Sequence, residues 1–489
     1  MVIKMFRWIL KQTLKSLLFL LNAALIVFVT LILAGAFAAR NKADLEIWHT
    51  VELASEFRAG SDITTLEEYL QNEERLFLEL DQQIVSRVEL NEKNELNRFA
   101  RGSRSFPERN GRNWNRSEVL SPDTIRGGVL LIHGMTDSPY STRHFRQMFL
   151  DKGYYVLNLR MPGHGTTPGE LSRIDWRDWE AAVRIGAADV TAHLAPDMPF
   201  YIMGYSNGGS LALNYTLDSL KDTGLRIPDH LFLISPMLGV SGLARFGKIY
   251  QWLGKLKFFR KSQWQDIYPE YDPHKYNSFP MNAAHQSVEI TAAINGKLRR
   301  LSHSGAINIM PPVLTFQSLV DATVITRDLI SRLYERLPAN GSELVLFDVN
   351  RISVLEFFVN PRHDRLLNEL VNSTERNYTL TVIANEERRS ESISAQSRKP
   401  HQSEFNTQSL GMEWPEEFYS LSHVALPFPP DDEVYGFSPG ENPSEVIQLG
   451  NVQMVGERGA LTFPSNLYTR ARSNPFFAYL KQRVLDESL

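Results

Sequence analysis

The chain has 489 residues, of which 43% are hydrophobic and 22% charged, as in an ordinary globular enzyme with a large core. Its net charge of −4 gives no sign of a nucleic-acid-binding protein. The absence of cysteine excludes disulfides, thiolate metal sites and a cysteine nucleophile.

An apolar run from Leu17 to Ala39 is long enough to span a bilayer as a helix. Four basic residues and no acidic residue precede it: Lys4, Arg7, Lys11 and Lys15. The positive-inside rule therefore predicts a single-pass membrane protein with a cytoplasmic N-terminus and an extracytoplasmic body, in a bacterial inner membrane facing the periplasm. A cleaved signal peptide is the alternative, because Ala36-Phe37-Ala38 resembles a cleavage site.

We expect three segments: a cytoplasmic tip and transmembrane helix (1–42), a helical neck and linker (43–120), and an α/β domain (121–489). In the neck, Thr64 or Thr65 can form a capping box with Glu67 or Glu68. An apolar stripe at helical spacing follows, which is typical of packing and receives no chemical role. Its members are Leu66, Tyr69, Leu70, Leu76, Phe77, Leu80, Ile84 and Val88.

From residue 126 onward, expected strands and helices alternate, which predicts an α/β fold with a mostly parallel sheet. The strands are expected at 128–132, 154–159, 199–205, 230–234 and 311–316, and the first two helices at 141–152 and 176–194.

The most informative stretch is Gly204-Tyr205-Ser206-Asn207-Gly208, which follows an expected strand and precedes residues with helical spacing. Gly-x-Ser-x-Gly between a strand and a helix is typical of a nucleophile elbow. The serine there adopts a strained backbone conformation, and glycines on either side let strand and helix approach each other. Ser206 is therefore the candidate nucleophile. An ordinary glycine-rich turn is the alternative.

Two more motifs, His133-Gly134 and Gly163-His164-Gly165, end the preceding strands in turn. Together with the elbow they resemble the α/β-hydrolase superfamily, particularly its monoglyceride-lipase and serine-aminopeptidase-like branch. The resemblance extends over residues 126–321 and resumes around His423. It implies an α/β-hydrolase fold with a helical cap insertion at about 238–306, and a triad in the chain order Ser, Asp or Glu, His.

The resemblance suggests Asp321 as the acid of this triad. The segment Ser318-Leu319-Val320-Asp321-Ala322-Thr323-Val324 is similar to the family's Gly-x-x-Asp-x-x-Val, with Ser318 at the glycine position. Asp348, at the end of the apolar run 344–347, is the alternative. A solvated turn aspartate is the interpretation without catalysis.

The chain order leaves three histidines as candidates for the base. His363 is expected at the exposed start of a helix, and His401 follows a polar stretch, 386–399, that is expected to be a mobile loop. His423 lies in an apolar context that resembles the family's histidine loop, and it is the predicted base. The chain between Asp321 and His423 is longer than the family pattern requires, which indicates an additional insertion at about 350–418.

The resemblance also implies an oxyanion hole formed by the backbone N–H groups of Met135 and Asn207. His133 and His164 are expected to shape their loops. No metal or cofactor is expected, because metal-ligand spacings and nucleotide-binding glycine fingerprints are missing. Aromatic residues of the expected cap suit an apolar acyl group: Tyr250, Trp252, Phe258, Phe259, Trp264, Tyr268, Tyr271, Tyr276 and Phe279.

These features predict a serine hydrolase that cleaves lipid-like or small acyl esters of carboxylic acids through Ser206, Asp321 and His423. The first alternative is a serine aminopeptidase or amidase of the same fold. The second is a non-catalytic, membrane-anchored binding scaffold, because a fold alone does not establish a function.

Overall fold

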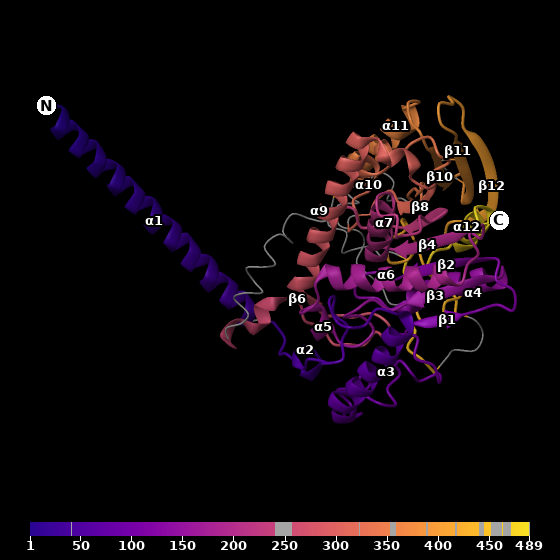
Figure 1. Cartoon of the computed structure of the whole chain (residues 1–489), viewed down its shortest axis with the longest axis horizontal. Coiled ribbons are helices and arrows are strands. Elements are labelled where there is room, and N and C mark those ends of the chain that lie inside the picture. The colour runs from indigo at the N-terminus through magenta and orange to yellow at the C-terminus, as the bar shows by residue number, and fades with distance from the viewer. Residues whose placement is uncertain are drawn as a thin grey trace.

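A computed structural model of the chain describes residues 1–40, 42–239, 257–321, 323–352, 358–387, 390–415, 418–439, 445–450, 462 and 471–488. Helix α1 (Val2–Arg40) projects away from a body in which helices cover a central sheet (Figure 1).

The body is built on a ten-stranded sheet with the order β1-β3-β2-β4-β5-β8-β9-β10-β11-β12. Neighbours from β3 to β10 pair in parallel, whereas β1, β11 and β12 add antiparallel strands at the two edges. The strands are β1 (Glu118–Leu120), β2 (Gly127–Ile132), β3 (Tyr154–Leu159), β4 (Phe200–Tyr205), β5 (His230–Ile234), β8 (Val313–Ser318), β9 (Glu343–Phe347), β10 (Thr379–Asn385), β11 (Ser392–Arg398) and β12 (Asn406–Glu413). The predicted mostly parallel sheet is confirmed.

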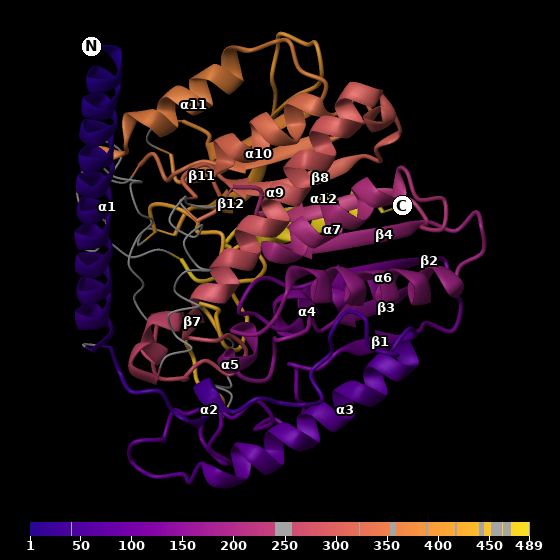
Figure 2. The same cartoon turned by 60° about the vertical axis from the view of Figure 1, so that its left-hand side comes forward.

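Helices pack on both faces of this sheet (Figure 2). The helices of the body are α2 (Ile47–Thr50), α3 (Leu66–Gln83), α4 (Arg143–Asp151), α5 (Pro168–Leu171), α6 (Trp176–Ala192), α7 (Asn207–Ser219), α9 (Met281–Ser304), α10 (Thr326–Arg332), α11 (Pro361–Asn372) and α12 (Phe477–Asp486). Every residue of the central strands β2, β3, β4, β5, β8 and β9 is buried. This explains their near-continuous apolar sequences, since a strand covered on both faces needs no polar alternation.

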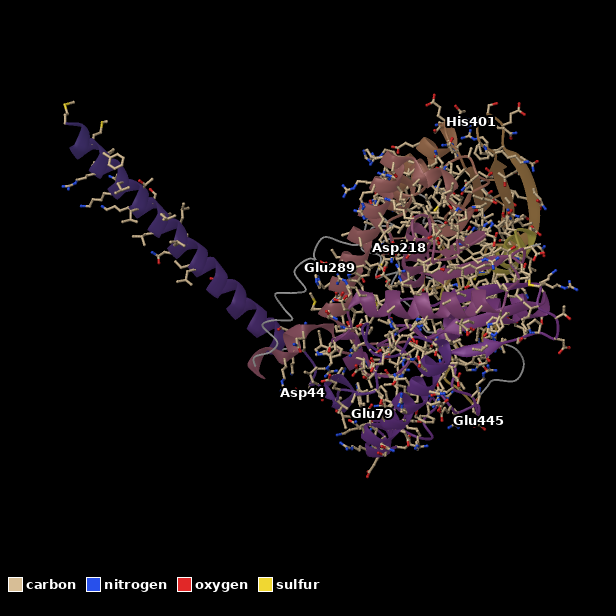
Figure 3. The ribbon with its side chains drawn as sticks, in the orientation of Figure 1. Asp44, Glu79, Asp218, Glu289, His401 and Glu445 are labelled. Carbon is tan, nitrogen blue, oxygen red and sulfur yellow. The ribbon has the colours of Figure 1, made fainter. Side chains whose placement is uncertain are left out.

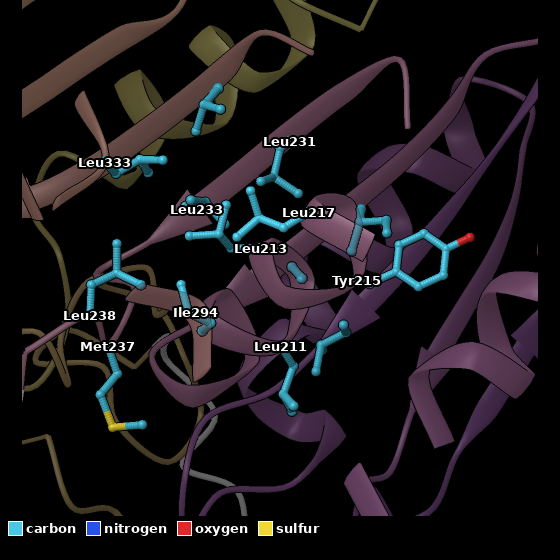
Figure 4. Packing of buried hydrophobic residues seen from close by; sticks show 14 of the residues in the cluster. Leu211, Leu213, Tyr215, Leu217, Leu231, Leu233, Met237, Leu238, Ile294 and Leu333 are labelled. Carbon is cyan, nitrogen blue, oxygen red and sulfur yellow. The ribbon is translucent and has the colours of Figure 1, made fainter. Parts of the chain in front are cut away.

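Helix α7 is the packing centre behind the elbow strand. Its Leu211 and Leu213 are buried, as are Leu231 and Leu233 on β5 and Ile294 on α9 (Figure 4). Each fully buried leucine or isoleucine contributes about 1.5–3 kcal/mol of transfer free energy. The start of α7, and with it the serine turn, therefore rests on a rigid base.

The segment 43–120 packs directly onto the sheet domain. Helix α3 begins with the predicted capping box, in which Thr65 and Glu68 each accept a hydrogen bond from the other's backbone. Tyr69 of this helix belongs to the main hydrophobic core. Arg160, just after β3, is buried and forms ion pairs with Glu56 at 3.1 Å and Glu73 at 2.9 Å. The expected three-segment division stays a prediction.

The residues between 350 and 418 extend the sheet. They contribute α11 and the strands β10, β11 and β12, and β11 pairs with a strand on each side. The expectation of a mobile loop at 386–399 was therefore wrong for 392–398, which form β11. The polar sequence of this strand gives no alternating pattern, and three consecutive residues, Ile393, Ser394 and Ala395, are buried.

Within the residues that the structure describes, none of the helices has a stretch both long enough and apolar enough to cross a membrane. Much of the predicted span, including 27–29 and 31–40, lies outside the residues whose side chains are described.

Candidate active site

Ser206 occupies a strained turn between β4 and α7. Its φ of 52° and ψ of −113° lie in a region that side-chain-bearing residues rarely adopt. Backbone hydrogen bonds hold the turn, because the Ser206 N–H donates to Ile234 O at 2.9 Å and Met237 N–H donates to Ser206 O at 3.0 Å. Such strain persists only where the surroundings enforce it. The predicted strained turn between a strand and a helix is present, and the role of Ser206 as nucleophile stays a prediction.

The two glycines of the motif allow the tight approach of backbone to backbone. A Cβ atom on Gly204 would overlap the carbonyl group of Gly208, and one on Gly208 would overlap the carbonyl oxygens of Ile132 and His133. The elbow can therefore sit against the end of β2 only because both residues lack a side chain.

Asp321 lies just beyond the end of β8, and its carboxylate accepts hydrogen bonds on both oxygens. Oδ1 accepts the N–H groups of Thr323 and Val324, both at 2.9 Å. Oδ2 accepts the Ser235 hydroxyl at 3.4 Å and the Gln317 amide at 3.3 Å. These donors fix the orientation of the carboxylate. Sequence reasoning missed Ser235 and Gln317, although both lie at the ends of strands.

His423 lies beside this carboxylate, with Nδ1 3.7 Å from Asp321 Oδ1 and 12% of its side chain exposed. The loop that carries it is fixed by Ser318, whose hydroxyl donates to Leu421 O at 2.7 Å. Asn350 N–H also donates to Tyr419 O at 2.8 Å. Ser318 does not have a positive φ, so this position does not need a glycine. Its hydroxyl connects the end of β8 to the loop that carries His423.

The strands β4, β5 and β8 are parallel neighbours, so Ser206 and Asp321 follow strands that end at the same edge of the sheet. The middle strand, β5, connects Ser206 to Asp321 through hydrogen bonds at its end. Ile234 accepts the backbone N–H of Ser206, and the next residue, Ser235, donates to Asp321. The structure thus brings Asp321 and His423 together and presents Ser206 at the same edge.

Met135 and Asn207 also lie at this edge. Met135 is in the loop after β2, which neighbours β4, and Asn207 is the first residue of α7. The N–H of a first helical residue has no acceptor within its own helix, so it is available to a ligand. His133, before Met135, is buried and its Nε2 accepts the N–H of Met161 at 3.0 Å. Burial holds the pKa of His133 well below its usual value, so it stays neutral and shapes the loop.

Comparisons with known proteins find similarity to hydrolases. Residues 123–349 match a family model described as serine aminopeptidase, S33. A thermostable monoacylglycerol lipase from Bacillus sp. (strain H-257) is 27% identical to this chain over 197 residues, which are 40% of this chain and 71% of that protein. The chain is a hydrolase, and these similarities support the α/β-hydrolase superfamily.

Solved structures similar to this hydrolase include two lipases. The monoacylglycerol lipase from Paleococcus ferrophilus is 16% identical, with a TM-score of 0.36, and the match covers 47% of this chain and 88% of that one. A soluble variant of the Saccharomyces cerevisiae monoglyceride lipase, in complex with a substrate analogue, is 17% identical, with a TM-score of 0.33 and coverage of 47% and 82%.

The alternative acid of the hydrolase, Asp348, is committed to a buried ion pair. Both of its oxygens accept hydrogen bonds from the Arg351 guanidinium, each at 2.8 Å. Burial raises the pKa of Asp348, and Arg351 opposes this shift. This geometry is that of a structural pair, in which the carboxylate is already occupied by a fixed cation.

The other two histidines lie elsewhere in the hydrolase. His363 is in the first turn of α11, as predicted, but it is buried and accepts a hydrogen bond from Arg362, so the expected exposure was wrong. His363 lies on the same side of α11 as Leu366 and Leu370, which belong to the main hydrophobic core, and this explains its burial. His401 lies in the turn between β11 and β12, at the outer end of the sheet extension (Figure 3).

The cap contributes aromatic residues that pack onto the body. Trp264 and Tyr276 are buried, and the Tyr276 hydroxyl donates to Gly163 O at 3.2 Å. Tyr250 and Trp252, which were expected to lie over the cleft, are outside the described residues. Within the described part of the chain, no group of three or more histidine or acidic side chains is placed to hold a metal ion.

Proposed function

We propose that this protein is a serine esterase that hydrolyses carboxylic esters through Ser206, His423 and Asp321. The observation that carries the proposal is the strained Ser206 turn at the sheet edge where the Asp321–His423 pair lies. A serine hydroxyl needs a base to remove its proton and an acid to orient that base. The acid here is itself oriented by four donors.

In the proposed reaction, His423 takes the proton of the Ser206 hydroxyl as its oxygen attacks the ester carbonyl carbon. The N–H groups of Met135 and Asn207 stabilise the oxyanion of the tetrahedral intermediate. The intermediate collapses, the C–O bond to the alcohol breaks, and the imidazolium gives its proton to the departing alkoxide. Water then attacks the acyl-enzyme with the same base, which releases the carboxylic acid and restores Ser206.

Lipid-like acyl esters are the substrates we favour. The support is the similarity to a protein named a monoacylglycerol lipase. The family description, serine aminopeptidase, favours amide bonds as the second candidate. Both reactions share the same nucleophile and base, so substrate comparison must separate them.

The test measures hydrolysis of p-nitrophenyl butyrate against amino-acid p-nitroanilides, together with fluorophosphonate labelling. The wild-type protein is expected to label and to cleave the ester faster, because fluorophosphonates react with activated serines. Ser206→Ala should abolish labelling and lower ester turnover by about 10⁴-fold or more, since the acyl-enzyme cannot form. Faster cleavage of the anilides would favour the peptidase. A folded wild-type protein that neither labels nor cleaves would contradict the enzyme proposal and favour the binding scaffold.

We also propose that α1 anchors the protein in a membrane, with the N-terminus in the cytoplasm. The support is the apolar run of the sequence and the exposure of apolar side chains along the helix. These are Phe6, Trp8, Leu10, Leu14, Leu17, Leu18, Phe19, Leu20, Leu21, Leu25 and Ile26. A bilayer would remove this surface from water.

Membrane fractionation of the full chain in a bacterial host tests the anchor. The wild type should remain with membranes after a carbonate wash, and added protease should reach its body only from the periplasmic side. Leu25→Arg combined with Ile26→Arg should release the protein, because both positions lie near the middle of the run 17–39, where each charge costs about 2.5–3.5 kcal/mol. Recovery of the wild type in the soluble fraction would contradict the anchor, and an N-terminus just after Ala38 would identify a cleaved signal peptide.

A further inference from the structure

The loop that follows β2 carries one of the two proposed oxyanion donors and depends on contacts with the cap. Thr136 has a φ of 63°, which is strained for a β-branched residue. Its carbonyl oxygen accepts the N–H of Tyr276 at 2.9 Å. Asp137 N–H donates to Gly134 O at 3.3 Å, which closes the loop around Met135. The position of the Met135 N–H is therefore set by residues on both sides of it.

Lys275 makes the charged contact to this loop. Its Nζ lies 3.1 Å from Asp137 Oδ1, and the two side chains are 17% and 5% exposed. A pair so shielded from water is screened by salt much less than a surface pair. Loss of one partner leaves the other charge buried and unpaired. This buried ion pair joins the cap to the loop formed by residues 133–137, here called the oxyanion loop.

The same ammonium group faces the segment that follows the proposed base. It lies 4.7 Å from the ring centroid of Phe428 and 4.9 Å from that of Tyr435, which is the geometry of a cation–π interaction. Two hydrogen-bonded turns connect Phe428 to the histidine loop: Phe428 N–H donates to Ala425 O, and Ala425 N–H donates to Ser422 O, both at 3.1 Å. The Lys275 side chain therefore contacts both the loop that carries Met135 and the segment that follows His423.

The cap itself holds Lys275 in place. Asp272 Oδ1 accepts the N–H of Lys275 at 3.0 Å and the Tyr435 hydroxyl at 2.6 Å. Arg98 donates to Lys275 O at 3.0 Å. The backbone at 275 is therefore fixed from two directions, and only the side chain reaches toward the oxyanion loop.

We propose that Lys275 is a positioning residue. Through Asp137 and the rings of Phe428 and Tyr435, it holds the loop of Met135 and the segment of His423 in a fixed position relative to each other. The inference rests on the proposed function, because it needs an oxyanion to develop at Met135. Lys275 touches no reacting atom. Its contribution is preorganisation, since a donor held in place before the reaction costs no reorganisation during it.

The pair also predicts a pH dependence. Burial raises the pKa of Asp137 to about 6, Lys275 opposes this shift, and Asp272 adds to it. Tyr435 is the other titratable group that interacts with Asp137. As the pH falls through 6, Asp137 takes up a proton and the ion pair is lost, so activity should fall. This loss is not unfolding, because a carboxyl whose pKa is higher in the folded state favours folding when it is protonated.

The test uses the full chain with p-nitrophenyl butyrate and compares kcat, KM and pH profiles. Lys275→Met should lower kcat about 10–100-fold and change KM less than about threefold. This fall in kcat is smaller than the fall that complete loss of an oxyanion donor causes. The acidic limb near pH 6 should disappear from its kcat profile, because no ion pair remains to be lost when Asp137 takes up a proton. Lys275→Arg should restore both kcat and the limb. A merely structural role would leave the limb in place.

Lys297→Met is the matched control. Lys297 is 18% exposed and pairs with Asp218 at 2.6 Å, but this pair joins α9 to α7 (Figure 3 labels Asp218). The control should keep the wild-type kcat and pH profile. If Lys275→Met is folded and keeps both, the inference is wrong.

Asp137→Asn carries the test if Lys275→Met does not fold. The kcat of Asp137→Asn should fall by a similar factor to that of Lys275→Met. Its pH profile should keep only the limb that reports the proposed base, His423, whereas an unchanged pH profile would overturn the inference. A folded wild-type protein that neither cleaves the ester nor labels with fluorophosphonate would instead refute the proposed function on which the inference rests.

Discussion

The variant Asp321→Asn is expected to lose about 10³–10⁴-fold in kcat while it keeps its fold. A carboxamide retains one acceptor for the N–H groups of Thr323 and Val324, so the turn should persist. It cannot stabilise the imidazolium of His423, and it favours the wrong tautomer of the ring. Ester turnover of the purified variant, with circular dichroism as a measure of folding, checks this expectation.

Asp348→Asn is the matched control for the choice of acid. Asp348 is also a buried aspartate that follows a strand, but it is paired with Arg351. The control should unfold at lower denaturant concentration, because Arg351 loses one of its two carboxylate partners and keeps only Asp364, and it should retain its kcat. If instead Asp348→Asn is inactive and Asp321→Asn is active, the acid has been assigned to the wrong strand.

The variant Arg160→Met is expected to lower the free energy of unfolding by about 3–5 kcal/mol. Removal of the guanidinium leaves Glu56 and Glu73 buried without their cation. It also removes the hydrogen bond from Arg160 to His164 O at 3.0 Å. Urea denaturation of the full chain, followed by tryptophan fluorescence, measures the change.

Arg184→Met provides the comparison. Arg184 pairs with Asp218 at 2.8 Å, but its side chain is 37% exposed. A surface pair of this kind contributes about 0–1 kcal/mol, so the unfolding free energy should change little. Equal effects of the two substitutions would show that the buried network contributes no more to the free energy of unfolding than a surface ion pair does.

Local patterns were sufficient to predict the central sheet. Strands β3 and β5 have the predicted bounds, because each is a short buried apolar run that ends at turn residues. The Ser206 turn was predictable for the same reason, since its two glycines and its flanking elements are contiguous in the sequence.

Long-range features were not predictable in the same way. The pairing of Arg160 with Glu56 joins segments that are far apart in the sequence, and neither residue carries a local signal of burial. The strained φ of 42° at Ser235, which presents its hydroxyl to Asp321, depends on neighbouring strands. The sheet extension was obscured because β12 is polar and mostly exposed, without the alternation that marks a strand.

The hairpin of β11 and β12 lies in the chain between the proposed acid and the proposed base, and its turn at His401 is exposed. A cut at this turn would place Ser206 and Asp321 on one fragment and His423 on the other. We expect neither fragment to complete a turnover by itself, because the proposed acid and base would be separated. Pairing of β11 with β12 should bring the two fragments together and restore cleavage of a chromogenic ester.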